Sequence, residues 1–463
     1  MALLFTISTL CACVSGEPPA PNVLLVSIDS LRADHVHAYG YDRPTSPNID
    51  RLATDGARFA TTISPSSWTL PTHVTLLTSL PPEVHGVVNA RTRLSDEAWT
   101  LAEVFQSHGY ATAGFVSGPN LRGFYGYRQG FDVYDDKSLG RLKDLRGDSS
   151  PTLVGLATDW LDGWNRAGRV QPFFLFAHLW DVHYDYSPPP PYDSMFDPGY
   201  DRSFDFSHFE RNKGIRADMD PRDLRHLIAL YDGEIRYTDD HLGRLLAKLD
   251  ELGVADDTIV VVTADHGDEF FEHGQKGHSK TLFDEIVRVP FVLRYPRRVP
   301  PGRVIGPQVR LMDVGPTILG LAGVPPGPGF GVAGGPAGSR FQDLSPWIVG
   351  GSSAGPFPRL TAFGETKAWR PKRVSIRTED TKVIQSFGGR NQRLRQAFDL
   401  AADPAERRNL AERARVAQPD LLALDRRLTQ WVRHWANDEH ELREPAQPSE
   451  KHIERLRALG YVE

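Results

Sequence analysis

The chain has very few cysteines, no excess of basic residues and no long apolar run in its body. Only two cysteines, Cys11 and Cys13, occur among 463 residues, so the body holds no disulfide, no cysteine-rich metal site and no thiol nucleophile. The 53 Lys and Arg and 59 Asp and Glu residues are mixed along the chain, which indicates no basic surface for nucleic acid. No run after residue 20 approaches the roughly 18 apolar residues of a spanning helix, which excludes a multispan membrane protein. Any chemistry must therefore use Asp, Glu, His, Ser or Thr.

The first twenty residues have the order of an export signal. A short apolar stretch, residues 2–10, precedes a polar, proline-rich segment, residues 16–21. The residues from Leu10 to Cys13 resemble the lipobox of bacterial lipoproteins, in which a lipidated cysteine becomes the first mature residue. We therefore expect an exported protein, periplasmic or at the cell surface, that a lipidated Cys13 would tether to a membrane. The alternative is an ordinary N-terminus, because the stretch is short and no Lys or Arg precedes it.

Three continuous apolar runs predict strands that are buried on both faces. Residues 22–29, 172–178 and 258–266 end in Asp29, in His178, and in Asp265 with His266. A polar residue at one strand end is as often a structural cap as a ligand-binding group. Because ligands bind at the carboxyl ends of strands in open α/β sheets, the three ends together predict a functional site.

Helical patterns alternate with these strands, at residues 50–56, 101–108, 151–165 and 224–252. This alternation predicts an α/β fold, in which helices sandwich a large, mostly parallel sheet. From residue 323 to 355 the composition shifts to Gly, Pro and Ser, which indicates a long loop and a domain boundary. Strand-like pieces at 373–378 and 381–387 and a charged helix at 419–437 follow. We expect a signal segment at 1–20, a catalytic domain at 21–350 and a small α+β C-terminal subdomain at 356–463.

A cluster of hydroxyl side chains, residues 64–79, joins a loop to a helix whose N-terminus we place near Thr72. The hydroxyl of Thr69 would stand at the positive end of that helix, where anions are attracted. Taken alone, the cluster is more typical of an ordinary helix cap.

At this point the sequence resembles the sulfatase family of the alkaline phosphatase superfamily, nearly from end to end. No single motif is specific to this family, but the number, order and spacing of the matching motifs together are specific to it. The matching segments are residues 22–29, 43–53, 85–87, 181–186, 231–239, 263–268, 282–290 and 399–411. The resemblance implies a metal-dependent hydrolase of sulfate or phosphate esters.

The family signature begins at a nucleophilic cysteine, or sometimes serine, that is oxidised to formylglycine, and it ends in Thr-Gly. Matching that ending to Thr78 and Ser79 places Thr69 at the nucleophile and His73 at the signature arginine. An alternative alignment of the signature would put Ile63 at the nucleophile position. It fails because isoleucine carries no nucleophilic group. Threonine is not known to us as a substrate for that oxidation, but it is the metal-bound nucleophile in relatives that act on phosphate esters.

The resemblance also implies a divalent metal cation, held by Asp29, Thr69, Asp265 and His266. Oxygen ligands with one imidazole suit such an ion, which lowers the pKa of a bound hydroxyl. Where a typical sulfatase has a second acidic ligand, this chain has Ser30. An oxygen-only calcium site is therefore less convincing, and manganese, magnesium or zinc becomes the stronger expectation.

The remaining site residues are also assigned by resemblance. His183 and His278 match family histidines and are expected to be catalytic, either one protonating the leaving oxygen. His73, His178 and Lys280 are expected to bind substrate, although His178 is as easily a supporting residue and Lys280 a solvated surface lysine.

The leading interpretation is an exported hydrolase that attacks a sulfate or phosphate ester in line through Thr69. The alternatives are a phosphodiesterase or phosphotransferase similar to lipoteichoic acid synthases, and a sulfatase-like binding protein with a decayed site. The substrate would be a small-molecule, glycan-linked or lipid-linked ester, and residues 192–220, rich in aromatic and charged side chains, are expected to form the lid that selects it. The sequence indicates no nucleic-acid partner and does not reveal the oligomeric state.

Overall fold

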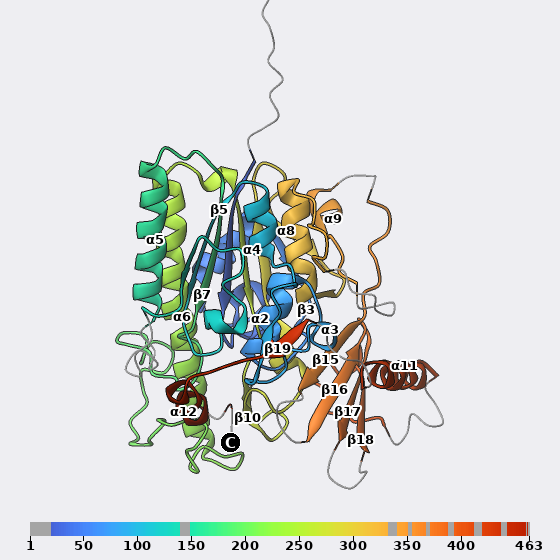
Figure 1. Cartoon of the computed structure of the whole chain (residues 1–463). Helices are drawn as coiled ribbons and strands as arrows, with labels where there is room; N and C mark the ends of the chain where they lie inside the picture. Colours follow the sequence, from blue (N-terminus) through green and yellow to red (C-terminus); the bar gives the residue numbers. More distant parts are fainter. Residues whose placement is uncertain are drawn as a thin grey trace, which may run out of the picture.

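The structure is a computed structural model of the whole chain (Figure 1). It describes residues 20–138, 149–331, 340–350, 354–366, 371–387, 393–411, 419–436, 442–459 and 461. The predicted export segment, apart from Ala20, lies outside these residues, and so does Cys13. Within the described residues, no helix has the length and apolar character needed to cross a bilayer.

A large sheet runs through the middle of the molecule, and only one of its strands, β12, is antiparallel to its neighbours. The three predicted strands form its centre as β7, β1 and β8, every residue of which is buried. In spatial order the strands are β13 (Arg303–Ile305), β2 (Ala57–Phe59), β12 (Phe291–Arg294), β8 (Thr258–Ala264), β1 (Asn22–Ile28), β7 (Phe173–Leu179), β5 (Ala111–Val116) and β6 (Val133–Asp135).

Helices cover both faces of this sheet, which confirms the predicted α/β sandwich (Figure 1). One group packs around α6 and the other around α2. The first group is α1 (Pro47–Asp55), α5 (Ser150–Arg166) and α6 (Pro221–Glu251); the second is α2 (Thr69–Thr78), α4 (Leu101–Ser107) and α8 (Val314–Ala322). Shorter helices are α3 (Pro82–His85), α7 (Asp284–Val287) and α9 (Ser345–Val349), with 3-10 turns at Ala33–His35, His37–Tyr39, Gly123–Tyr125, Ala255–Asp257 and Leu311–Asp313.

Helix α2 begins at Thr69, three residues earlier than the sequence predicts. Trp68 is its extended N-cap residue, and all ten residues of the helix are buried. Pro71 does not delay the start, because the first N–H groups of a helix have no intrahelical partner and proline loses nothing there. Thr69 therefore belongs to the first turn of the helix.

Smaller sheets surround the main one. They are β11 (Arg288–Val289), β3 (Thr62–Ile63) and β14 (Val309–Arg310); β9 (Glu269–Phe270) with β10 (Lys276–Gly277); and β4 (Thr92–Leu94) with β19 (Arg443–Pro445). A four-stranded antiparallel sheet follows the large domain. It is formed by β15 (Ala362–Thr366), β16 (Lys372–Arg377), β17 (Thr381–Phe387) and β18 (Arg393–Asp399). Helix α11 (Pro419–Ala436) packs Leu424, Leu428 and Trp431 against this sheet, as the predicted C-terminal subdomain requires.

The end of the chain does not stay with that subdomain, although the predicted range 356–463 includes it. Strand β19 pairs with β4 of the large domain, and Figure 1 shows helix α12 (Glu450–Ala458), in dark red, far from α11. Helix α12 lies against the 3-10 turn at Gly123–Tyr125, where His452 contacts the rings of Phe124 and Tyr125. We call the described residues 442–459 and 461 the C-terminal arm. The arm returns to the large domain because its apolar contacts, such as buried Leu456, belong to the main core.

Candidate active site

The two acidic residues of the site come together because their strands are neighbours. Strands β1 and β8 pair in parallel, with Ile28 opposite Ala264, so Asp29 and Asp265 leave the sheet side by side. Both carboxylates are completely buried. Burial, and then the charge of Asp265, raise the pKa of Asp29 well above its usual value. Although burial acts to raise it too, nearby histidines, His266 first, lower the pKa of Asp265 to about 2.

Helix α2 aims its N-terminus at these carboxylates and places Thr69 against them. The Thr69 hydroxyl lies 3.3 Å from Oδ2 of Asp29 and 3.3 Å from Nε2 of His266. The four predicted metal ligands, Asp29, Thr69, Asp265 and His266, are thus brought together, and each is fully buried.

These residues fit a divalent cation. One ligand atom each from Asp29, Asp265 and His266 lies within 4.8 Å of the others, and Oδ2 of Asp265 has no hydrogen-bond partner. Two buried carboxylates beside one imidazole repel one another unless a positive charge joins them. Ser30 orients them, because its N–H donates to Oδ1 of Asp265 (3.1 Å) and its hydroxyl to Oδ1 of Asp29 (2.9 Å).

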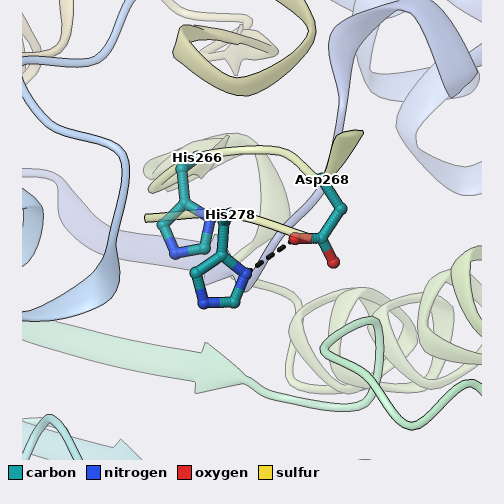
Figure 2. A group of neighbouring side chains, drawn as sticks. All are labelled: His266, Asp268 and His278. Carbon is teal, nitrogen blue, oxygen red and sulfur yellow. Dashed lines mark hydrogen bonds and ion pairs between the residues drawn. The ribbon is translucent and has the colours of Figure 1, made fainter. Parts of the chain in front are cut away.

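A second group of metal-competent side chains, His266, Asp268 and His278, overlaps the first (Figure 2). Within it, Nδ1 of His278 donates to Oδ1 of Asp268 at 2.7 Å, and Oδ2 of Asp268 accepts the Tyr186 hydroxyl at 2.5 Å. These bonds already use the carboxylate, and His266 is common to both groups. The first group is therefore the better candidate to hold a cation.

Asp268 fixes which nitrogen of His278 carries the proton. Because Nδ1 donates to the carboxylate, Nε2 keeps its lone pair, and burial holds the pKa of His278 well below its usual range. His183 has the same arrangement, since its Nδ1 donates to the Tyr184 carbonyl at 2.6 Å and its ring stacks on Trp180. The ring centroids of the two predicted catalytic histidines lie 5.0 Å apart. Both Nε2 atoms lie within hydrogen-bond distance of one hydroxyl group.

That hydroxyl belongs to Tyr461 of the C-terminal arm. Its oxygen lies 2.7 Å from Nε2 of His183 and 3.2 Å from Nε2 of His278. Burial raises the pKa of Tyr461 well above 10, and a hydrogen bond with the Thr69 side chain acts in the opposite direction. Thr69 and both histidines therefore meet at one phenol oxygen.

The histidine at the signature-arginine position, His73, contacts the backbone of Thr69. Its Nδ1 donates to the Thr69 carbonyl at 2.9 Å, and its Nε2 accepts from the Ser27 hydroxyl at 2.9 Å. Burial lowers the pKa of His73 to about 3, so the ring is neutral and ties helix α2 to strand β1. These contacts describe a positioning residue, and its predicted role in substrate binding stays a prediction.

The other two predicted substrate-binding residues have different surroundings. Nε2 of His178 lies 3.3 Å from Oδ2 of Asp29, and burial lowers the pKa of this histidine to about 4. Lys280 is partly exposed and pairs with the Glu210 carboxylate. These contacts do not test whether His178 or Lys280 binds a substrate.

The expected lid, residues 192–220, contacts the loop that carries His278. The Lys276 amine donates to three carbonyl groups of the segment, those of Phe209, Asn212 and Ile215. The ring of Phe209 stacks with Tyr184, which in turn stacks with His278. The segment is thus close enough to the site to affect which substrates enter.

Two residues of the site were not assigned from the sequence. Asp268 stands in the segment 263–268 that carries the resemblance, so a carboxylate two residues after His266 was a usable signal. The sequence offers no usable signal for Tyr461, because an aromatic residue near a chain end is most often a packing residue.

A known protein family matches more than half of the chain. The model of a family described as Sulfatase matches residues 21–324. The ulvan-active sulfatase of Formosa agariphila is 25% identical over 331 residues, covering 66% of this chain and 63% of that protein. The N-acetylglucosamine-6-O-sulfatase of Bacteroides thetaiotaomicron is 22% identical over 497 residues. The match covers 88% of this chain and 86% of that protein. The chain thus spans less than two thirds of the ulvan-active sulfatase, but most of the second relative.

Solved structures show the same fold. A protein bound to its substrate D-glucosamine-2-N,6-O-disulfate superposes with a TM-score of 0.73 at 19% identity, covering 91% of this chain and 99% of that one. A phosphonate monoester hydrolase of Agrobacterium radiobacter superposes with a TM-score of 0.70 at 22% identity. The superposition covers 92% of this chain and 100% of that one. The relatives support the expected class of sulfuric ester hydrolase, while the structures establish the fold.

Proposed function

The chain belongs to the sulfatase family, and on that premise we propose that it hydrolyses a sulfate or phosphate ester through Thr69. The observation that carries the proposal is the position of the Thr69 hydroxyl, 3.3 Å from both Asp29 and His266 in the first turn of α2. A hydroxyl among buried metal-competent groups is set to become a nucleophile.

Asp29, Thr69, Asp265 and His266 would hold the cation. When bound, a divalent cation lowers the pKa of a hydroxyl and stabilises negative charge on the transferred group. The imidazole ligand, and Ser30 in place of a second acidic ligand, support manganese, magnesium or zinc rather than calcium.

The chain's own residues would carry the reaction in two steps. The Thr69 hydroxyl gives its proton to Nε2 of His278 or His183, and Thr69 Oγ forms a bond to sulfur or phosphorus. The ester oxygen leaves with the bonding electron pair and takes that proton from the same Nε2. The negative charge of a bound ester favours the protonated imidazole that this step needs. Water then cleaves the Thr69 ester with the same histidine as base, which returns the hydroxyl and releases sulfate or phosphate.

Phosphate-ester chemistry is the second candidate, and the threonine itself favours it. A formylglycine site needs an oxidisable cysteine or serine, and neutral His73 offers no fixed charge in place of the usual arginine. A phosphodiesterase or phosphotransferase similar to lipoteichoic acid synthases is compatible with the same residues. A decayed binding protein is disfavoured, since Thr69, the acidic pair and both catalytic histidines are all in place.

The deciding experiment is a substrate panel for the metal-reconstituted full chain. Aryl sulfate, phosphate monoester, phosphate diester and phosphonate substrates are compared, with Thr69→Ala as the matched control. Turnover of at least one substrate that is lost in Thr69→Ala supports the proposal, and the preferred substrate assigns the chemistry. Binding of these esters without turnover would favour the decayed site.

We further propose that the protein is exported and that Cys13 is its lipid anchor. The support is the apolar stretch with a lipobox-like tail at residues 10–13. Small-molecule, glycan-linked and lipid-linked esters are all compatible with a site at the cell surface.

A further inference from the structure

The described residues of the C-terminal arm attach to the large domain and reach the site. Strand β19 pairs with β4 over three residues, and the His452 ring contacts the Tyr125 hydroxyl at 3.3 Å. Nearer the site, the Tyr184 hydroxyl donates to the carbonyl of Leu459 at 3.4 Å. The arm ends with the phenol of Tyr461, which is only 5% exposed.

With the arm in this position, the reacting groups have almost no access to solvent. Thr69 is fully buried, and His183 and His278 are 2% and 1% exposed. The Tyr461 ring lies against Trp68, the residue just before the nucleophile, with ring centroids 6.0 Å apart. A substrate cannot reach Thr69 while these contacts persist.

The Tyr461 oxygen stands where a substrate oxygen has to stand. A leaving oxygen must lie within hydrogen-bond distance of a histidine Nε2 while the atom that carries it is next to Thr69. The phenol oxygen already meets these conditions, at 2.7 Å and 3.2 Å from the two Nε2 atoms and in contact with Thr69. Two atoms cannot share one position, so phenol and substrate exclude one another.

The hydrogen bonding also shows that Tyr461 is an incomplete partner. Both Nε2 atoms carry lone pairs, because each Nδ1 donates elsewhere, but the phenol has a single proton. Only one of the two contacts is therefore a full hydrogen bond.

We propose that the C-terminal arm is an intramolecular competitor of substrate, with the Tyr461 phenol held in the place of the leaving oxygen until an ester displaces it. This inference rests on the proposed function. It predicts that the arm raises the apparent KM, since a site that is open for only a fraction of the time has its affinity reduced by that fraction.

The kinetic test compares Tyr461→Ala and Tyr461→Phe with the wild-type full chain, metal-reconstituted, on the best substrate of the panel. Tyr461→Ala should lower KM and raise kcat/KM by about tenfold or more, because the competitor is removed. Tyr461→Phe keeps the ring but loses the hydroxyl, and its gain should be smaller. Lys451→Ala, an exposed change on α12, is the matched control and should not alter either constant.

A second measurement follows the arm itself by amide hydrogen exchange, with orthovanadate as the probe of the site. Exchange in α12 should accelerate several-fold when vanadate binds wild type, because the released arm loses its contacts. In Tyr461→Ala, vanadate should change this exchange little.

The outcomes separate the two proposals. A fall or no change in kcat/KM for Tyr461→Ala, or slower exchange of α12 with vanadate, would show that Tyr461 binds substrate or is merely structural, and would overturn the competitor. Absence of turnover in both wild type and Tyr461→Ala would instead remove the proposed hydrolysis, and the inference with it.

Discussion

Oδ1 of Asp268 accepts a hydrogen bond from Nδ1 of His278 at 2.7 Å, while its Oδ2 accepts the Tyr186 hydroxyl at 2.5 Å. The Asp268 carboxylate therefore accepts hydrogen bonds from two donors at once. It fixes the His278 ring with Nε2 directed at the Tyr461 hydroxyl, on the side of the nucleophile.

Asp268→Asn should lower kcat by about 10²–10⁴-fold. An amide has one oxygen for the two donors, so His278 or Tyr186 loses its acceptor and the imidazole loses its fixed tautomer. Steady-state kinetics with elemental analysis checks this, because the metal content should be unchanged. Tyr186→Phe, which removes only the second donor, should cost much less, and an equal loss in both variants would contradict the tautomer argument.

Asp265→Asn combined with His266→Ala should abolish bound divalent metal and lower the melting temperature. A ligand that binds only the native state stabilises it by mass action, by about 4 kcal/mol at a thousandfold excess over Kd. Elemental analysis and thermal melts with and without chelator measure both effects. Asp239→Asn, a buried change outside the proposed ligand set, is the control for metal content alone, and equal metal content in all three proteins would remove the metal-site assignment.

Thr69→Ala should reduce turnover by at least about 10³-fold and leave the fold intact, whereas Thr69→Ser should keep a measurable fraction. Both hydroxyls can be activated in the same way, and the methyl side chain cannot. Initial rates with circular dichroism test this, and peptide mass spectrometry should find an unmodified threonine, or a sulfated or phosphorylated one if the intermediate is trapped. Near wild-type activity in Thr69→Ala would mean that water is the attacking group.

Asp239 should make folding stability fall between pH 5 and pH 8. Its carboxylate accepts from the backbone N–H groups of Asn48 and Ile49, and burial raises its pKa to about 7. A raised carboxyl pKa means that the native state holds the proton longer than the unfolded state, so stability declines as pH rises towards 7. Relative to Asp239→Asn, wild type should lose about 2–3 kcal/mol over this range. Urea unfolding at pH 5 and pH 8 measures the difference, and parallel pH profiles would contradict the assignment.

Cys13→Ser should move the protein from the membrane fraction to the soluble fraction if Cys13 is lipidated. An acyl chain on Cys13 would add apolar surface that a bilayer can bury. Fractionation of cells that express wild type, Cys13→Ser and Cys11→Ser is the measurement. Unchanged partitioning of Cys13→Ser would reject the lipobox interpretation.

The sequence by itself determined the central strands and the acidic residues at their ends. A strand buried on both faces must be apolar over its whole length, so its carboxyl end is visible in the sequence as a sudden polar residue, Asp29 or Asp265. The helices α4, α5 and α6 follow the predicted ranges within a few residues for a similar reason, because helical periodicity is a local property.

Only the tertiary structure decided how the site is closed. His183 and Tyr461 are 278 residues apart in the chain and share a hydrogen bond because the arm turns back to the large domain. No local pattern encodes such a meeting, since it depends on where distant segments pack. The same holds for His73, whose bonds to Ser27 and to the Thr69 carbonyl follow from helix α2 lying on strand β1. Local composition thus fixed which side chains could react, and long-range packing fixed which of them meet.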